Sequence, residues 1–339
     1  MSRIAVIGGG AWGTALAAVA ARSGDHEVRL WALEKEVCES IAREHVNTLF
    51  LPECKLPESL AATNDFREAL VGAEIVVSVM PSHHCRRSFE HMAQWLRPEM
   101  LFVSATKGIE NDTLLRMSQV IREVVERYCH FKPNIAVLSG PSFAREVAEG
   151  KPTAVTVASA DLKLAARVQK DFSDPRFRIY LNDDVIGVEL GGALKNVIAI
   201  AAGICAGLDT GHNSVAALIT RGLVEITRLA VACGAEPQTM AGLAGMGDLV
   251  LTCTGGLSRN RSVGSALGEG RKLSEIMAGM HGMVAEGVLT TNAAVGLAKK
   301  HGVEMPITEQ MHAILHEDKS AHDAIRALMT RPGKAEDRF

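Results

Sequence analysis

A glycine-rich run near the amino end, Gly8-Gly9-Gly10-Ala11-Trp12-Gly13, has the residue types that hold a dinucleotide. It fits the pattern G-x-G-x-x-G and lies between a strand-like run, Ile4–Gly8, and a helical pattern. In such a loop Gly8 permits the tight turn, Gly10 lets the backbone approach a pyrophosphate, and Gly13 lets helix and strand pack closely, while the helix N-terminus faces the anion. The sequence therefore predicts a dinucleotide site. The alternative is a glycine turn that serves packing alone.

The end of the next predicted strand normally distinguishes NAD from NADP. Here the segment reads Trp31-Ala32-Leu33-Glu34-Lys35, with no acid directly at the strand end for a ribose hydroxyl and no arginine for a 2′-phosphate. Glu34 could reach the ribose and Lys35 could meet a phosphate, or both could be solvated residues at the start of a helix. The cofactor preference stays open at this point.

Three later strand-like runs end in polar turns: Met80-Pro81-Ser82, Thr106-Lys107-Gly108 and Ser139-Gly140-Pro141-Ser142. In an open α/β sheet, ligands bind beyond the carboxyl ends of the strands. We therefore expect these turns to share an edge with the glycine run and to line a crevice. Lys107 is the only charged residue in them and is a candidate for contact with a substrate. A solvated loop lysine is the alternative.

Lys195 lies in an apolar helical pattern, in the segment Gly191-Gly192-Ala193-Leu194-Lys195-Asn196. Its neighbours one helical turn away are two glycines, an isoleucine and an alanine, and none of these can be an ion partner. Each glycine weakens a helix by about 1 kcal/mol relative to alanine, so we interpret the pair as bare backbone that admits a flat ligand. Such a lysine is a candidate functional residue. The alternative is a side chain that extends along the surface to water.

A run in the second half combines glycines, hydroxyls and cations: Thr252-Cys253-Thr254-Gly255-Gly256-Leu257-Ser258-Arg259-Asn260-Arg261. It passes from a turn into a helix, and a helix N-terminus beside an arginine suits a small phosphate monoester. The run therefore predicts a phosphate site. Asp248 lies just upstream in a glycine turn, where an aspartate is usually only a cap or turn former.

Short β-branched runs alternate with helical patterns up to about residue 182, which implies βαβ units and a largely parallel sheet. The predicted strands are Ile4–Gly8, Val28–Trp31, Ile75–Val79, Leu101–Ser104, Ile135–Leu138, Ala154–Val157 and Arg178–Leu181. The predicted helices are Ala11–Ser23, Lys35–His45, Leu114–Arg127, Phe143–Glu149 and Leu162–Phe172. The predicted fold class is an α/β, Rossmann-type doubly wound sheet followed by an all-α domain.

The pattern changes after residue 182, where strand-like runs nearly vanish. Asn182-Asp183-Asp184 is a candidate cap for a first long helix, roughly Val185 to Ala206. We predict a dinucleotide-binding domain over residues 1–182, a helical substrate domain over 183–330 and a frayed tail over 331–339.

Composition excludes several kinds of partner. The net charge of −3 gives no overall attraction to nucleic acid or to an anionic membrane. A phosphate must therefore be held by a local cluster of residues. The seven cysteines form no C-x-x-C pair, so neither a zinc ribbon nor a redox dithiol is indicated, and their scatter and odd number favour a reducing compartment. No signal peptide is visible, and the apolar run Val197–Leu208 is too short to span a bilayer. We therefore predict a cytoplasmic protein.

Taken together, these motifs resemble the bacterial NAD(P)-dependent glycerol-3-phosphate dehydrogenases. The resemblance covers nearly the whole chain and is carried by G-G-G-A-W-G-T, A-T-K-G-I-E, L-S-G-P-S-F-A, G-V-E-L-G-G-A-L-K-N-V-I-A-I-A-A-G, A-L-I-T-R-G, G-D-L-V-L-T-C-T, S-R-N-R and E-M-P-I-T-E. It implies a reversible reduction of dihydroxyacetone phosphate to sn-glycerol 3-phosphate with NAD or NADP as cofactor, feeding phospholipid synthesis. A homodimer is also expected, from the family and from apolar helices.

The resemblance further implies roles for individual residues. It points to Lys195 as the acid/base, with Lys107 and Asp248 beside the reacting oxygen. The predicted substrate contacts, which include the flanking candidates Asn196 and Thr252, are Lys107, Gly140, Ser142, Lys195, Asn196, Asp248, Thr252, Ser258, Arg259 and Asn260. The predicted cofactor contacts, which include the loop glycines, are Gly8, Gly10, Ala11, Trp12, Gly13, Lys107, Ala144, Arg259, Val284 and Glu286.

The implied reaction needs a proton for the substrate oxygen as hydride reaches the carbonyl carbon. A lysine near its reference pKa of about 10.4 is an ammonium ion at neutral pH, the form that an acid needs, and burial would lower that pKa and favour the reverse oxidation. Many relatives carry His or Arg where this chain has Ala32 and Leu33, so the resemblance does not imply selectivity for NADP.

Two other functions are consistent with parts of the pattern. A β-hydroxyacid dehydrogenase of related architecture also places a lysine on a helix after its dinucleotide domain, and would act on a carboxylate substrate. A nicotinamide-sensing regulator without catalysis would need a partner surface or a DNA-binding element, and no basic recognition helix is apparent.

Overall fold

The computed structural model describes residues 1–280, 285–333 and 335–336 and divides the chain into two compact units. Unit 1 comprises Met1–Lys107 and Leu115–Val185, and unit 2 comprises Gly108–Leu114 and Ile186–Phe339. The short segment 108–114 therefore belongs to the second unit although it interrupts the first in sequence. Part of the predicted frayed tail, residues 334 and 337–339, lies outside the described residues.

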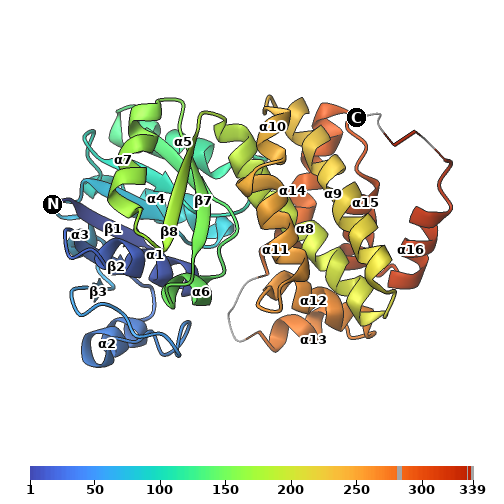
Figure 1. Cartoon of the computed structure of the whole chain (residues 1–339). Helices are drawn as coiled ribbons and strands as arrows, with labels where there is room; N and C mark the ends of the chain where they lie inside the picture. The colour runs from blue at the N-terminus through green and yellow to red at the C-terminus, as the bar shows by residue number, and fades with distance from the viewer. Residues whose placement is uncertain (281–284, 334, 337–339) are drawn as a thin grey trace. The chain divides into compact units, whose positions relative to one another are not determined.

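Unit 1 contains an eight-stranded sheet within the described residues (Figure 1). In spatial order the strands are β3 (Ala61–Thr63), β2 (Glu27–Trp31), β1 (Arg3–Ile7), β4 (Ile75–Ser78), β5 (Leu101–Ser104), β6 (Asn134–Ser139), β7 (Thr153–Ala158) and β8 (Phe177–Asn182). All neighbours pair in parallel except β6 and β7, which are antiparallel. The predicted fold class is thus confirmed, and every predicted strand is present.

Helices cover both faces of this sheet. The α-helices of unit 1 are α1 (Ala11–Ala21), α2 (Lys35–Glu44), α3 (Phe66–Leu70), α4 (Cys85–Met92), α5 (Met117–Cys129), α6 (Ala144–Ala148) and α7 (Leu162–Phe172), and η1 (Ser82–His84) and η2 (Ala93–Trp95) are 3₁₀ turns. One face packs against α1, α2, α6 and α7, and the other against α3, α4 and α5. Sequence patterns missed β3, α3 and α4, which are short or carry many charged residues.

The core strands form because their residues are apolar on both faces. All four residues of β4 and all four of β5 are buried. A parallel sheet with helices on both sides requires such continuous apolar runs, because neither face meets water. The strands β1, β4, β5 and β6 run in parallel side by side, so their carboxyl ends share one edge of the sheet.

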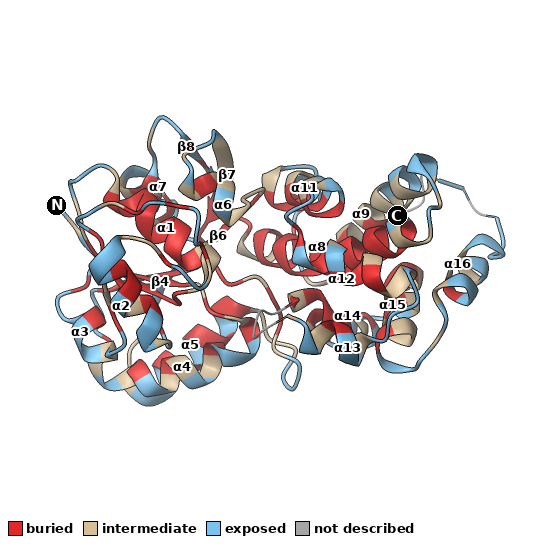
Figure 2. Cartoon of the chain, turned by 90° about the horizontal axis from the view of Figure 1, so that it is seen from below, coloured by how far each residue is buried: buried red, intermediate tan, exposed pale blue. Residues whose placement is uncertain are grey.

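All described elements of unit 2 are helical. They are α8 (Val185–Gly207), α9 (His212–Ala232), α10 (Pro237–Met240), the π-helical turn η3 (Leu243–Gly247), α11 (Asp248–Thr254), α12 (Arg259–Gly268), α13 (Leu273–Ala278), α14 (Glu286–His301), α15 (Pro306–His316) and α16 (Ala321–Met329). Figure 2 shows α8 as an almost continuously buried helix. Its length and composition would suit a membrane span, but 89% of its apolar window is buried inside the protein, as in a core helix.

A buried carboxylate ties α9 to the start of α15. Glu225 of α9 is 3% exposed, and its two oxygens accept hydrogen bonds from the backbone N–H of Ile307 (2.7 Å), the N–H of Thr308 (3.2 Å) and the Thr308 hydroxyl (3.3 Å). Burial raises the pKa of Glu225 to about 7, although these hydrogen bonds act in the opposite direction. The Glu225 carboxylate thus accepts hydrogen bonds from the first N–H groups of α15, as a capping residue would, although it is distant in sequence.

Candidate active site

The glycine run forms a tight turn between β1 and α1. Gly8 has φ +129°, and a Cβ there would lie 2.8 Å from the carbonyl group of Val79. A Cβ on Gly13 would lie 1.8 Å from the carbonyl oxygen of Gly8, so the close packing of helix on strand requires glycine. Gly10 is the N-cap of α1, and a Cβ there would meet no atom within 4 Å. A loop with open space before a helix N-terminus fits a dinucleotide pyrophosphate.

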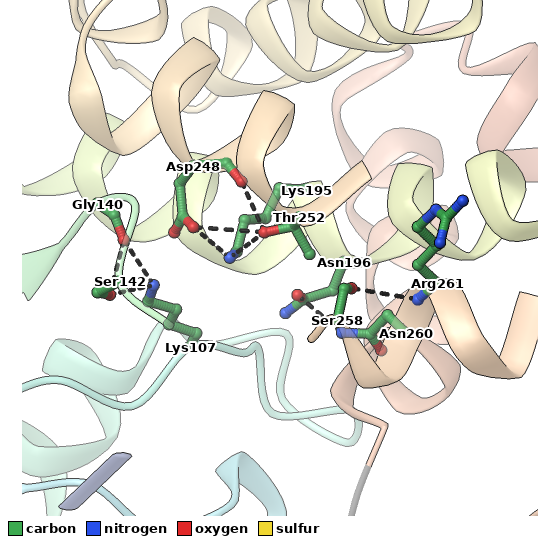
Figure 3. Close-up of polar contacts among 10 residues, drawn as sticks. All are labelled: Lys107, Gly140, Ser142, Lys195, Asn196, Asp248, Thr252, Ser258, Asn260 and Arg261. Atoms are coloured by element: carbon green, nitrogen blue, oxygen red, sulfur yellow. Dashed lines mark hydrogen bonds and ion pairs between the residues drawn. The ribbon is translucent and has the colours of Figure 1, made fainter. Parts of the chain in front are cut away.

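Lys107 links two neighbouring strand ends at the same edge of unit 1. Its ammonium group donates hydrogen bonds to the carbonyl oxygen of Gly140 (3.0 Å) and to the hydroxyl of Ser142 (3.5 Å), and that hydroxyl donates to the Gly140 carbonyl (2.9 Å) (Figure 3). Gly140 has φ +138°, and a Cβ there would lie 2.9 Å from the Cα of Val155. Lys107 is therefore a partly buried, positioned cation rather than a solvated loop lysine.

Lys195 is held in a buried ion pair in unit 2. Its Nζ atom donates to the Oδ1 atom of Asp248 (2.5 Å) and to the hydroxyl of Thr252 (2.7 Å), as Figure 3 shows. The Lys195 and Asp248 side chains are only 8% and 1% exposed, and the Thr252 hydroxyl donates in turn to the Asp248 carbonyl (2.6 Å). The Asp248 carboxylate compensates the positive charge that burial would otherwise leave unpaired. Sequence reasoning found no ion partner because the partner lies on another helix.

A glycine and a π-helical turn bring Lys195 and Asp248 together. A Cβ on Gly191 would lie 2.6 Å from the carbonyl oxygen of Ala244, so α8 approaches η3 closely at this point. Lys195 follows Gly191 by one helical turn, and Asp248 follows Ala244 by the same spacing, so the charged pair meets just beyond the glycine contact. The Gly247 N–H donates to the Gly242 carbonyl (3.1 Å), a bond five residues long that defines the π turn before Asp248. Such turns are frequent at functional sites.

This packing corrects the interpretation of one of the paired glycines, Gly191. The sequence suggested bare backbone that admits a flat ligand, but at Gly191 the space is filled by the backbone of Ala244 and Gly245. The glycine is needed for helix-to-helix approach, and the free energy lost in helix propensity is offset by the contact that positions Lys195.

A chain of amide groups connects three helices beside the lysine. The Asn260 side-chain amide donates to the Oδ1 atom of Asn196 (3.0 Å), and the Gly287 N–H donates to the Oδ1 atom of Asn260 (3.0 Å). Asn196 adjoins Lys195 on α8, Asn260 adjoins Arg259 on α12, and Gly287 adjoins Glu286 on α14. The chain therefore fixes the starts of α12 and α14 against the lysine helix.

The N-terminus of α12 has the features of an anion site. Ser258 is its N-cap and accepts from the Arg261 N–H (3.2 Å), while Arg259 is the first helical residue. Desolvation lowers the pKa of the Arg259 guanidinium, and the Glu286 carboxylate opposes that shift, so the two side chains interact. A helix N-terminus and an arginine together suit a phosphate group.

The Cys253 thiol is not a nucleophile. Cys253, between Thr252 and Thr254, is 1% exposed. Burial raises the pKa of Cys253 to about 12, so the thiol stays protonated. Among the described residues, no group of His, Cys, Asp and Glu side chains could hold a metal ion.

Both halves of the chain match models of one protein family. Residues 3–165 match the model "NAD-dependent glycerol-3-phosphate dehydrogenase N-terminus", and residues 184–326 match the model of the corresponding C-terminus. The chain belongs to the NAD-dependent glycerol-3-phosphate dehydrogenase family. The resemblance inferred from the sequence motifs is thereby confirmed.

The chain is also similar to individual glycerol-3-phosphate dehydrogenases over nearly its whole length. The chain is 67% identical to glycerol-3-phosphate dehydrogenase [NAD(P)+] of Koribacter versatilis, over 99% of each chain, and 57% identical to that of Acidobacterium capsulatum, over 99% of this chain and 100% of the relative. A crystal structure of glycerol-3-phosphate dehydrogenase from Coxiella burnetii is 42% identical, with a TM-score of 0.92 over 97% of this chain and 99% of that one. A β-hydroxyacid dehydrogenase is correspondingly not favoured.

Within each unit, the residues predicted for a glycerol-3-phosphate dehydrogenase site lie close together. Unit 1 gathers the glycine loop, Lys107, Gly140 and Ser142 at one sheet edge, and Ala144 opens α6, which packs against α1. Unit 2 gathers its predicted residues on α8, α11, α12 and α14: Lys195, Asn196, Asp248, Thr252, Ser258, Arg259, Asn260 and Glu286. Val284 lies outside the described residues. Contact of these residues with substrate or cofactor stays a prediction.

Sequence reasoning missed one polar residue behind the glycine loop. Asn47 is fully buried and donates hydrogen bonds to the Gly9 carbonyl and the Thr14 hydroxyl. It lies after α2 in an irregular stretch, where no periodicity draws attention to a single asparagine. The neighbours in Val46-Asn47-Thr48 give no signal in the sequence that marks this position.

Proposed function

We propose that this chain reduces dihydroxyacetone phosphate to sn-glycerol 3-phosphate with NADH or NADPH, in a reversible reaction that supplies glycerol phosphate for phospholipid biosynthesis. The observation that carries the proposal is the buried Lys195–Asp248–Thr252 cluster, attached through Asn196 and Asn260 to the anion-binding start of α12. An acid and a phosphate anchor held together suit a small phosphorylated ketone. Full-length similarity to glycerol-3-phosphate dehydrogenases [NAD(P)+] supports the same substrate and cofactors.

In this proposal Lys195 is the acid. Its ammonium group donates a proton to the carbonyl oxygen of the substrate during reduction, and the free amine takes the proton back during oxidation. Asp248 keeps the lysine charged, and Thr252 fixes the direction of its Nζ atom. The chemistry that a bound nicotinamide supplies is a hydride for the carbonyl carbon.

The remaining roles divide between the two units. In unit 2, Arg259, Ser258, Asn260 and Asn196 bind the substrate, with Arg259 as the charged anchor for its phosphate. In unit 1, the proposed substrate contacts are Lys107, Gly140 and Ser142, which lie at the carboxyl ends of the strands. The proposed cofactor contacts are Gly8, Gly10, Ala11, Trp12, Gly13, Lys107 and Ala144 in unit 1, and Arg259, Val284 and Glu286 in unit 2. We propose that the segment Ala32–Lys35, in which Leu33 is exposed, determines the preference for NADH or NADPH.

The assembly and location follow from the same assignment. We propose a homodimer, since α9 leaves Val231 and parts of its amino-terminal half exposed. We also propose a cytoplasmic location, which suits a chain whose long apolar helix α8 is a buried core helix.

An absorbance assay tests the proposed function directly. The purified protein is mixed with dihydroxyacetone phosphate and either NADH or NADPH, and loss of the reduced cofactor is followed. We expect turnover with at least one cofactor and formation of sn-glycerol 3-phosphate. Turnover with hydroxyacids or their keto acids, and none with the triose phosphate, would instead indicate a β-hydroxyacid dehydrogenase. No turnover with either class, despite nucleotide binding, would indicate a sensor.

A further inference from the structure

The glycine loop is held from behind by a buried asparagine that lies far from it in sequence. Asn47 and Thr14 are both 0% exposed. The Asn47 amide nitrogen donates to the carbonyl oxygen of Gly9 (2.8 Å) and to the hydroxyl of Thr14 (2.8 Å), and that hydroxyl donates to the same Gly9 carbonyl (3.3 Å). The Asn47 Oδ1 atom accepts from the Phe50 N–H (3.0 Å). Both amide hydrogens and the amide oxygen are therefore used, which is the condition for a stable buried polar network.

The network fixes one peptide group, the one that joins Gly9 to Gly10. In a trans peptide the C=O and N–H bonds point to opposite sides of the chain. Because the Gly9 carbonyl points toward Asn47 and Thr14, the Gly10 N–H points away from them. Gly10 borders open space and caps the N-terminus of α1, so this N–H belongs to the group of backbone donors that an anion can use.

Glycine would not maintain this direction by itself. Gly8, Gly9 and Gly10 lack side chains that restrict rotation of the intervening peptides, and glycine has the widest conformational freedom of any residue. Packing restrains Gly9 on one side, where a Cβ would lie 2.4 Å from the Cβ of Ala32. That contact restrains the Cα position, whereas the two hydrogen bonds to the carbonyl restrain the orientation of the peptide plane.

We propose that Asn47 is a positioning residue for the dinucleotide: it holds the Gly9–Gly10 peptide with its N–H directed to the pyrophosphate. The inference rests on the proposed function, because it assumes that the glycine loop binds NADH or NADPH. Asn47 does not touch the nucleotide in this account. It acts through Gly9, with Thr14 as a second and weaker support.

The test measures nucleotide binding in the absence of substrate. NADH and NADPH are titrated by fluorescence into the wild type and into Asn47→Ala. We expect the Kd of the variant to rise roughly tenfold to a hundredfold, the effect of one hydrogen bond to a charged group. In steady-state assays the KM for the nucleotide should rise by a similar factor, with a much smaller change in kcat and in the KM for the second substrate.

A matched control separates positioning from a general loss of stability. The Gln169 side-chain amide of α7 also donates to a backbone carbonyl of the sheet, that of Ile179 (2.7 Å), but lies outside the glycine loop. Gln169→Ala should lower the melting temperature without raising the Kd. An unchanged Kd in Asn47→Ala, or an equal rise in Gln169→Ala at equal loss of melting temperature, would overturn the inference.

A second pair of variants keeps the test decisive if Asn47→Ala does not fold. Thr14→Val removes the other hydrogen bond to Gly9 while keeping the side-chain volume, and should raise the Kd by a smaller factor. Thr14→Ser restores the hydroxyl and should bind like the wild type, and equal Kd values for the two variants would contradict the inference. A wild type that binds neither nucleotide would refute the proposed function itself, whereas wild-type binding with unaffected variants would refute only the role of Asn47.

Discussion

The nucleotide loop of unit 1 and the lysine pair of unit 2 are built in opposite ways. The loop uses backbone groups of consecutive residues, Gly8 to Gly13. Close contacts require glycine at Gly8, Gly9 and Gly13, while Gly10 borders open space. The pair uses two side chains, Lys195 and Asp248, which are distant in sequence and meet only because α8 approaches η3 and α11. A site made from local backbone is readable as a motif, whereas a site made from distant charges depends on the packing of the whole domain.

The two constructions also differ in what a mutation can remove. A backbone N–H remains after most side-chain substitutions, so the loop is disturbed mainly by replacing the residues that hold its backbone in place. A buried ion pair is damaged at once, because the partner that remains is an uncompensated charge. The following experiments use this difference, from the largest expected effect to the smallest.

Replacing the acid should have the largest effect. Lys195→Met is expected to lower kcat for reduction by roughly a hundredfold or more, the scale of lost general acid catalysis. The change also leaves the buried Asp248 carboxylate without its cation, which costs about 3–5 kcal/mol of stability. The double variant Lys195→Met/Asp248→Asn removes that charge and should recover the melting temperature but not kcat. Near-normal turnover in Lys195→Met would exclude the lysine from the chemistry.

Removing the phosphate anchor should act on binding. Arg259→Ala is expected to raise the KM for dihydroxyacetone phosphate by roughly tenfold to a hundredfold, since it deletes a hydrogen bond between charged groups. The neighbouring Arg261, whose backbone N–H bonds to Ser258, provides a control: Arg261→Ala should change the KM far less. If the two variants have equal KM values, the phosphate lies elsewhere.

Crowding the helix contact should disturb the lysine pair indirectly. Gly191→Ala places a Cβ about 2.6 Å from the Ala244 carbonyl, which pushes α8 from η3, and kcat should fall roughly tenfold because the acid is displaced. Gly207→Ala creates a similar clash at the far end of α8, with the carbonyl of Ser265 (2.2 Å). It should destabilise the protein to a similar extent, about 1–3 kcal/mol, while kcat remains closer to that of the wild type. Equal kcat values would show that the glycine contact does not position Lys195.

The smallest effect concerns Glu225, a buried carboxylate that accepts hydrogen bonds from the start of α15 and not from a lysine. The folded-state pKa of Glu225, about 7, lies above its ordinary value of 4.5. The folded chain therefore holds this proton more tightly, and the associated stability is fully present below about pH 4.5 and is lost as pH rises through about 7. Urea unfolding at pH 5 and pH 8 should show a decrease of about 2 kcal/mol in the wild type, and Glu225→Gln should abolish most of it. A wild-type decrease that persists in Glu225→Gln must arise from other groups.

The fold was largely predictable because its signals are local. Alternation of β-branched runs with helical patterns located the strands from β1 to β8 except β3, whose three residues are too few to show a pattern. The charged helices α3 and α4 were missed because their apolar faces are short. The antiparallel direction of β7 could not be predicted, since strand direction depends on the connection through α6 rather than on residue type.

The candidate site was predictable in its members but not in its contacts. Lys195 attracted attention through its apolar neighbours, and the phosphate run through its residue types. Nothing in the sequence shows that Thr252 bonds to Lys195, that Asn260 bonds to Asn196, or that Asn47 supports Gly9. Each of these contacts joins segments that are brought together only by tertiary packing.

The central claim is that the Asp248 carboxylate keeps Lys195 in the ammonium form that reduction requires. The measurement that tests it most directly is the pH dependence of kcat for reduction in the wild type and in Asp248→Asn. Removal of the carboxylate disfavours the ammonium ion, so the alkaline fall in activity should move to lower pH by about one unit or more, and the reverse oxidation should become active at lower pH. An alkaline limb at the same pH in both proteins would contradict the account.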